Sequence, residues 1–234
     1  MCGVGVGKMP NEKTLELNIT HEILEMCRQY DPLACSIGTT LIQESHLGYD
    51  SRVFSRFSLS WVTSPLQYKR AKRRVQIGKN VFQYVFDINN NTYHDQHLIL
   101  FYNLAGGRKR VAYYALPALF TNREFANSLP HLLNNTFFID VASIPSHMVD
   151  FQTHQILLDP QRRAAWLHSE EKEVKAISSE EFQGLVAERQ IGVSISMILE
   201  NMKSPPKDNL TPKSKRPRFL FNIVSTKNQK FIYR

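Results

Sequence analysis

The chain has few cysteines, only Cys2, Cys27 and Cys35 among 234 residues. They are too few and too scattered for a disulfide framework, and the absence of a Cys-x-x-Cys pair argues against a zinc site. No apolar run approaches the roughly 20 residues that cross a bilayer. The first residues, MCGVGVGKMPNEK, lack the basic start and long apolar segment of a secretory signal. We therefore expect a cytoplasmic protein with reduced thiols and no membrane contact.

The net charge of +8 is concentrated at the C-terminal end of the sequence. From Lys203 to Arg234 there are nine basic residues and one acid, so this tail alone carries +8 and residues 1–202 sum to zero. In the body, basic residues occur in three short clusters, at 69–74, 108–110 and 162–163. Such clusters favour a groove for a polyanion over a diffuse positive field, and ordinary solvated surface is the alternative for each of them.

Hydrophobic periodicity and turn signals predict an α/β domain. The strands we expect are 38–43, 50–57, 59–69, 79–87, 110–116, 136–141 and 154–158, and the helices we expect are 20–30, 93–104, 122–129 and 179–189. A helix followed by strands, and then by alternating helices and strands, favours a mixed central sheet flanked by helices.

The composition changes at the C-terminal end of this domain. Residues 204–218, SPPKDNLTPKSKRPR, are rich in Pro, Lys and Ser, which predicts a disordered linker. Residues 219–234 are apolar again, and we expect them to dock as a strand or arm, either on the body or on a partner chain. The sequence thus predicts a domain over 1–203 with a basic tail, for which assembly into a homodimer or a larger complex is one possible role.

The main candidate site lies at the ends of two consecutive predicted strands. If these strands form a hairpin, Asp50 at the start of the first lies beside Gln67 and Lys69 at the end of the second. Side chains at i and i+2 of a strand share a face, so Gln67 and Lys69 point together while Tyr68 points away. The hairpin would gather a carboxylate, an amide oxygen and an ammonium around one point.

These groups suit metal-assisted hydrolysis of a phosphodiester. Asp50 and Gln67 offer oxygen ligands to Mg²⁺ (or Mn²⁺), a hard ion that keeps several waters and accepts phosphate oxygen. The ion would polarise the phosphorus centre and lower the pKa of a bound water. Lys69 would orient that water or stabilise the charge that grows on the phosphate.

The pattern Glu44…Asp50-x16-Gln67-x-Lys69 resembles the PD-(D/E)XK nuclease superfamily in a form with Gln in place of the second acid. The resemblance covers roughly residues 40–120. It implies a restriction-endonuclease-like core, catalytic roles for Glu44, Asp50, Gln67 and Lys69, a metal held by Asp50 and Gln67, and DNA as the substrate. The run ESHLGYD, followed by LQYK, is similar to bacterial members that look like restriction or phage-defence nucleases.

Two features depart from the superfamily pattern. Gln67 supplies a ligand oxygen but no charge, so the metal affinity should be lower than with a carboxylate. The Gln-x-x-x-Tyr signature of some branches is not matched, because Leu100 stands four residues after Gln96. Gln96 and His97 either face the metal or the scissile phosphate, or they form a polar first helical turn.

The basic residues after the second strand complete the expected site. Arg70, Lys72, Arg73 and Arg74 are expected to contact DNA phosphates, which would make binding salt-sensitive without reading the base sequence. The main hypothesis is a metal-dependent DNA endonuclease, which needs two sites or two events to cut a duplex. Two alternatives stay open: a nucleic-acid-binding module with a decayed site on the same fold, and a complex-assembly subunit that acts through its tail.

Overall fold

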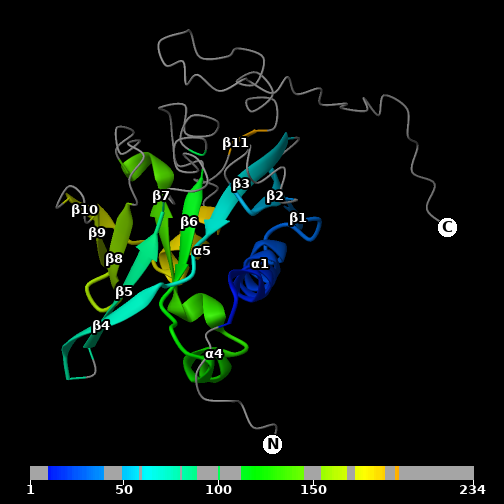
Figure 1. Ribbon diagram of the computed structural model, residues 1–234. Helices are drawn as coiled ribbons and strands as arrows, with labels where there is room; N and C mark the ends of the chain where they lie inside the picture. The colour runs from blue at the N-terminus through cyan, green and yellow to red at the C-terminus, as the bar shows by residue number, and fades with distance from the viewer. Residues whose placement is uncertain are drawn as a thin grey trace, which may run out of the picture. The chain divides into compact units, whose positions relative to one another are not determined.

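The computed structural model describes residues 10–39, 49–57, 60–79, 81–88, 100, 112–144, 154–167, 172–187 and 193–194. Within these ranges the chain is mixed α/β, with three helices and two sheets (Figure 1). The helices are α1 (Glu12–Arg28), α4 (Asn122–Ser128) and α5 (Ser179–Ala187), and the short 3-10 helices are η2 (Leu132–Asn135) and η3 (Val141–Ser143). The predicted linker 204–218 and arm 219–234 lie outside the described residues.

The first sheet contains the predicted hairpin. Its strands are β1 (Cys35–Gly38), β2 (Ser51–Phe57), β3 (Ser60–Tyr68), β6 (Tyr113–Pro117), β7 (Thr136–Asp140) and β11 (Val193–Ser194). The strand order is β1-β2-β3-β6-β7, and β11 also pairs with β3. Only β3 and β6 run parallel, while the other pairs are antiparallel. The first sheet is therefore mixed, as the sequence predicts.

The second sheet was not expected, because the sequence predicts one central sheet. Its strands are β4 (Arg73–Gly78), β5 (Val81–Asp87), β8 (Gln155–Asp159), β9 (Ala164–Leu167) and β10 (Lys172–Lys175), in the order β10-β9-β8-β5-β4. Every pairing in it is antiparallel. The strands β4, β9 and β10 were missed. β4 begins inside the basic run and exposes Val75 and Ile77, so it lacks the half-buried alternation that identifies a strand.

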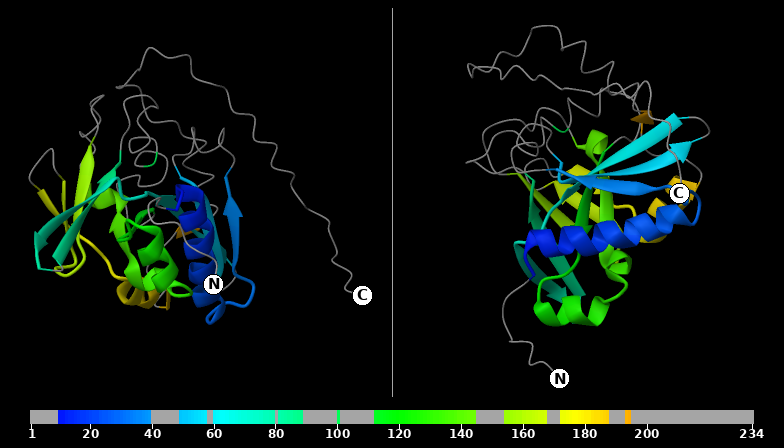
Figure 2. Two further views of the ribbon diagram at one scale, coloured as in Figure 1. Left: turned by 60° about the horizontal axis from the view of Figure 1, so that its bottom comes forward. Right: turned by 90° about the vertical axis from the view of Figure 1, so that its right-hand side faces the viewer.

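Helix α1 covers one face of the first sheet (Figure 2). Its apolar residues Leu15, Ile19 and Ile23 recur every four positions and pack in one buried cluster with Val53 of β2 and Leu66 of β3. The predicted start near Thr20 was wrong. The helix begins at Glu12, after Asn11, whose side chain accepts a hydrogen bond from the backbone N–H of Thr14 at 2.7 Å.

Helix α5 closes the same cluster from the other end of the chain. Phe182 stacks on Phe138 of β7, with ring centroids 4.0 Å apart and planes 14° apart. It also meets Tyr113 of β6 edge-on, with centroids 5.4 Å apart. Such aromatic pairs contribute about 0.5–1.5 kcal/mol beyond the area they bury. The predicted helices over 122–129 and 179–189 are confirmed as α4 and α5 as far as the described residues extend.

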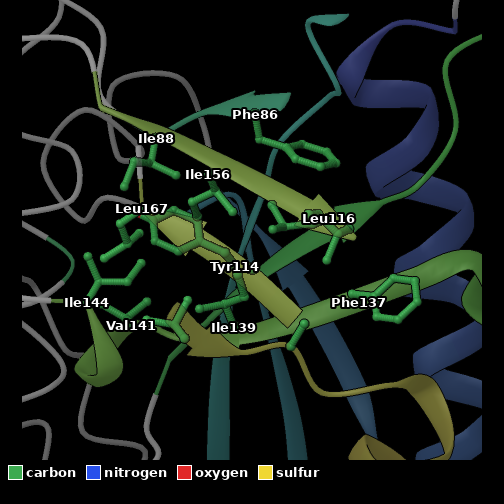
Figure 3. Close-up of a cluster of buried hydrophobic side chains, with 14 of the residues drawn as sticks. Phe86, Ile88, Tyr114, Leu116, Phe137, Ile139, Val141, Ile144, Ile156 and Leu167 are labelled. Carbon is green, nitrogen blue, oxygen red and sulfur yellow. The ribbon is translucent and has the colours of Figure 1, made fainter. Parts of the chain in front are cut away.

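The second sheet covers the opposite face of the first one. Between the two sheets lies a second buried cluster, to which Tyr114 and Leu116 of β6 contribute from one side and Phe86 and Ile156 from the other (Figure 3). Leu100, the one described residue of the predicted helix 93–104, is also buried in this cluster. Strand β6 is buried along its whole length because it lies between the two clusters.

The remaining expectations differ from the structure mainly at element ends. The strand expected over 38–43 appears as β1, Cys35–Gly38, and residues 40–43 lie outside the described part. The strands expected over 50–57, 59–69, 79–87, 136–141 and 154–158 are confirmed within two residues. None of the helices in the described part combines the length and apolar character of a bilayer-spanning segment.

Candidate active site at the adjoining ends of β2 and β3

Asp50 lies immediately before β2, where its backbone still belongs to the sheet. Its N–H donates to the carbonyl oxygen of Leu66 at 3.0 Å, and its own carbonyl oxygen accepts from the N–H of Thr39 at 2.8 Å. Because Ser51 pairs with Leu66 in the hairpin register, Asp50 falls opposite Gln67. The expected neighbourhood of Asp50 and Gln67 is therefore present.

The Asp50 carboxylate is held by two donors from β3. Its Oδ2 accepts a 2.8 Å hydrogen bond from Nε2 of Gln67 and a 2.6 Å hydrogen bond from the backbone N–H of Tyr68. Asp50 is 6% exposed and Gln67 is 0% exposed, so this contact is removed from solvent. A charged acceptor in such a setting forms stronger hydrogen bonds than a neutral one, so the pair has a defined geometry.

Tyr68 points to the other face of the first sheet, as the alternation of a strand requires. Its hydroxyl lies 2.7 Å from Oγ1 of Thr20 on α1. Burial raises the pKa of Tyr68 well above its ordinary value, and the hydrogen bond to Thr20 only partly opposes that shift. The phenol therefore stays protonated at neutral pH and ties α1 to the strand that carries Gln67.

Strand β3 lies between β2 and β6, and the residue of β6 that pairs with Gln67 is Tyr114. Burial raises the pKa of Tyr114 strongly, and the negative charge of Asp50 raises it further. Tyr114 is thus a neutral phenol beside the carboxylate, and it cannot serve as a base near pH 7.

Lys69 follows directly in the same ladder and is partly buried. Its backbone N–H donates to the carbonyl oxygen of Ala115 at 3.1 Å, which extends the β3–β6 pairing by one residue beyond the strand. Alternation along this ladder puts Lys69 on the face of Gln67. The expected carboxylate, amide and ammonium are thus carried by adjoining backbone segments, whereas Glu44, Gln96 and His97 lie outside the described residues.

The oxygen atoms of Asp50 and Gln67 are the candidate ligands for a metal ion at this site. In the part of the chain that the structure describes, no group of three His, Cys, Asp or Glu side chains is placed to hold a metal. The oxygen donors here are the Asp50 carboxylate and the Gln67 amide, a small set that fits Mg²⁺, which commonly takes one or two carboxylates together with waters and phosphate oxygens. Since Gln67 turns Nε2 toward Asp50, its amide oxygen is the atom that would serve an ion.

The basic residues after β3 fall into two groups. Arg70, Lys72 and Arg73 are exposed, and Lys72 pairs with Asp87 at 2.6 Å. Arg74 is different, because it forms an ion pair with Glu124 of α4 and its guanidinium carbon lies 4.2 Å from the ring centroid of Phe82. Three of the four residues expected to contact phosphates are thus exposed, whereas Arg74 is partly buried and joins β4 to α4.

Arg52 and Tyr49 were not predicted as site residues from the sequence. Arg52 lies on β2, with its guanidinium carbon 4.5 Å from the ring centroid of Tyr49. Its Nε is buried and has no hydrogen-bond partner among the described residues. Burial lowers the pKa of Arg52 from its ordinary value. The signal that could have found it is its spacing, because a residue two positions after Asp50 in a strand shares its face.

No protein-family model, curated protein or solved structure matches the chain.

Proposed function

We propose that the chain is a metal-dependent endonuclease that hydrolyses phosphodiester bonds in DNA. The observation that carries the proposal is the buried 2.8 Å contact between the side chains of Asp50 and Gln67, at the adjoining ends of two paired strands. Lys69 follows in the same ladder. A carboxylate, an amide oxygen and an ammonium in this order are what the PD-(D/E)XK pattern requires, with Gln in place of the second acid.

The order of elements supports the same proposal. Helix α1 is followed by the antiparallel strands β1, β2 and β3, and β6 then pairs in parallel with β3. A parallel neighbour requires a crossover connection, which here includes Leu100. A helix, three strands, a crossover and a parallel strand form the order of a restriction-endonuclease-like core. On this proposal, the second sheet is an addition to that core.

The roles proposed for the side chains follow from their chemistry. Asp50 and the amide oxygen of Gln67 would hold Mg²⁺ or Mn²⁺, which when bound supplies Lewis-acid polarisation of the phosphate and an acidified water. The N–H of Tyr68 keeps the Asp50 carboxylate oriented. Lys69 would donate to a non-bridging phosphate oxygen and stabilise the charge that develops there. Because the Tyr114 phenol stays neutral, the negative charge beside it belongs to Asp50.

The substrate proposed is duplex DNA. Arg70, Lys72 and Arg73 are exposed just beyond the end of β3, where they would neutralise phosphates that flank the cut. A restriction or phage-defence role in the bacterial cytoplasm is the biological setting we propose. Two copies, or a larger complex joined by the basic tail, would place two such sites on the two strands of a duplex.

The test is nicking of supercoiled plasmid with 10 mM Mg²⁺ or Mn²⁺. We expect cutting by the wild type and a loss of roughly 100-fold or more in Asp50→Asn and Lys69→Met, the size of effect seen when one charge-stabilising group is removed. Asp50→Asn keeps an acceptor for the N–H of Tyr68, and Lys69→Met keeps the apolar stem. Glu173→Gln on β10, an exposed charge change, is the matched control. Equal activity in wild type and Asp50→Asn would overturn the proposal.

A second candidate function has one observation in its favour. The two hydrogen bonds that Oδ2 of Asp50 accepts give that carboxylate a structural role, because one of them satisfies the N–H of Tyr68 where β3 ends. The chain would then be a nucleic-acid-binding module without catalysis. That function predicts salt-dependent DNA binding that needs no metal and survives Asp50→Asn, with no nicking by any variant.

A further inference from the structure

Arg52 shares the sheet face of the candidate site. It pairs with Pro65, two positions from where Asp50 faces Gln67. The intervening positions, Ser51 and Leu66, belong to the other face, since Leu66 and the residue two after Ser51, Val53, are buried in the cluster against α1. Residues two apart in a strand are about 6.6 Å apart along it, so the Arg52 side chain can reach a group held at Asp50.

The position of Arg52 is fixed by packing. Its guanidinium carbon lies 4.5 Å over the ring of Tyr49, which is 1% exposed and belongs to the cluster between the two sheets. Stacking on a buried ring restrains the planar guanidinium. The Nε atom is buried and has no hydrogen-bond partner among the described residues. A buried donor on a cation needs an acceptor, and an anion at the site would supply one.

The chemistry of the group identifies the acceptor class. A guanidinium presents a fork of donors that matches the paired oxygens of a phosphate, and it stays charged at every physiological pH. An ammonium has no such fork. On the same face, the Lys69 ammonium carries three rotatable donors but no planar fork, so the two cations are not interchangeable.

We propose that Arg52 is the phosphate-binding residue of the Asp50–Gln67 site, where it holds a non-bridging oxygen of the DNA phosphodiester. The inference rests on the proposed function for the identity of the substrate. Arg52 would contact the phosphate from within strand β2. It is distinct from the exposed cations Arg70, Lys72 and Arg73, which come after the end of β3.

The experiment measures binding and cutting separately in the full chain. A labelled 20-base-pair duplex is titrated by fluorescence anisotropy in Ca²⁺ and in EDTA, at several salt concentrations. We expect Arg52→Gln to weaken binding about tenfold and to lower the slope of log affinity against log salt by about one, as the loss of one phosphate contact requires. In plasmid nicking, kcat/KM should fall by about ten- to a hundredfold.

Two further variants define the result. Arg123→Gln removes the same charge from an exposed position on α4 and should bind DNA within twofold of wild type. Arg52→Lys keeps the charge and the stem but loses the fork, so it should remain folded and still bind several-fold more weakly than wild type. Circular dichroism and thermal melts establish that each variant is folded.

The outcomes separate this inference from the proposed function. If the wild type cuts, and folded Arg52→Gln and Arg52→Lys bind and cut like wild type, the Arg52 inference is overturned while the nuclease proposal stands. If the wild type does not cut DNA with any metal tested, but Arg52→Gln loses DNA affinity and salt slope, the nuclease proposal fails and the phosphate role of Arg52 stands.

Discussion

Replacing Gln67 with Glu tests the buried pair on which the site depends. In the wild type, the Gln67 amide donates to Oδ2 of Asp50 at 2.8 Å, and Gln67 is 0% exposed. Gln67→Glu replaces this donor with a second carboxyl group at the same place. Two carboxylates in contact in a buried site cannot both ionise, so one of them must keep a proton.

The free energy needed to keep that carboxyl protonated sets how much stability Gln67→Glu loses and how the loss depends on pH. In the unfolded chain a Glu carboxyl titrates near pH 4.3, and holding it protonated costs about 1.4 kcal/mol for each pH unit above that value. The folded-state pKa of the new carboxyl is raised above its unfolded value, so the deficit grows as pH rises. We expect Gln67→Glu to be less stable than wild type by about 1 kcal/mol at pH 5 and about 3.7 kcal/mol at pH 7.

The assay is urea unfolding at pH 5, 6, 7 and 8, with and without 10 mM Mg²⁺. An ion bound at the site would neutralise both carboxylates, so Mg²⁺ should stabilise Gln67→Glu more than wild type. Gln76→Glu, the same change at an exposed position of β4, should stay within about 0.5 kcal/mol of wild type at every pH. A Gln67→Glu variant whose stability parallels wild type from pH 5 to 8 would refute the reasoning.

Three further predictions concern Tyr68, Arg74 and Cys27. Tyr68→Phe removes the buried hydroxyl that meets Thr20, so it should lower the free energy of unfolding by about 1–3 kcal/mol, measured in urea, while the backbone N–H still orients Asp50 and nicking persists. Arg74→Met breaks a partly exposed ion pair with Glu124, so it should lower the free energy of unfolding by about 1 kcal/mol or less. DNA affinity should stay unchanged. A fall in affinity as large as that of Arg70→Gln would contradict the role of Arg74 as a contact within the protein. Burial raises the pKa of the Cys27 thiol to about 12, whereas Cys35 is exposed. A thiol reagent at pH 8 should therefore label Cys35 in the native protein and reach Cys27 only in urea. Peptide mapping by mass spectrometry would show which cysteine is labelled.

Much of the first sheet could be predicted because local signals and burial agree. β2 and β3 carry apolar and β-branched residues, and the hairpin register follows from their short connection, since Phe57 pairs with Ser60. α1 was placed too late because Thr20 looks like an N-cap, whereas the apolar repeat already begins at Leu15. The second sheet could not be predicted as a separate layer, since the pairing that joins its two parts, β5 with β8, brings together strands that lie far apart in the sequence.

The candidate site was predictable in its backbone but not in its contacts. The spacing from Asp50 to Gln67 predicted that these two residues face each other. The alternation of side chains along a strand predicted that Lys69 shares the face of Gln67. No sequence rule indicates that the Gln67 amide would turn its nitrogen toward Asp50, because side-chain orientation depends on tertiary neighbours such as Tyr114. The basic run suggested four equivalent cations, and only the position of Glu124 shows that Arg74 forms an internal contact.

The most direct test of the account is a crystal structure of the protein soaked in Mn²⁺, with anomalous scattering to locate the metal. We expect one Mn²⁺ bound by the Asp50 carboxylate and the amide oxygen of Gln67, and no metal at that position in Asp50→Asn. A wild-type crystal with no anomalous peak at these two side chains, from protein that nicks plasmid in the same Mn²⁺ solution, would contradict the account.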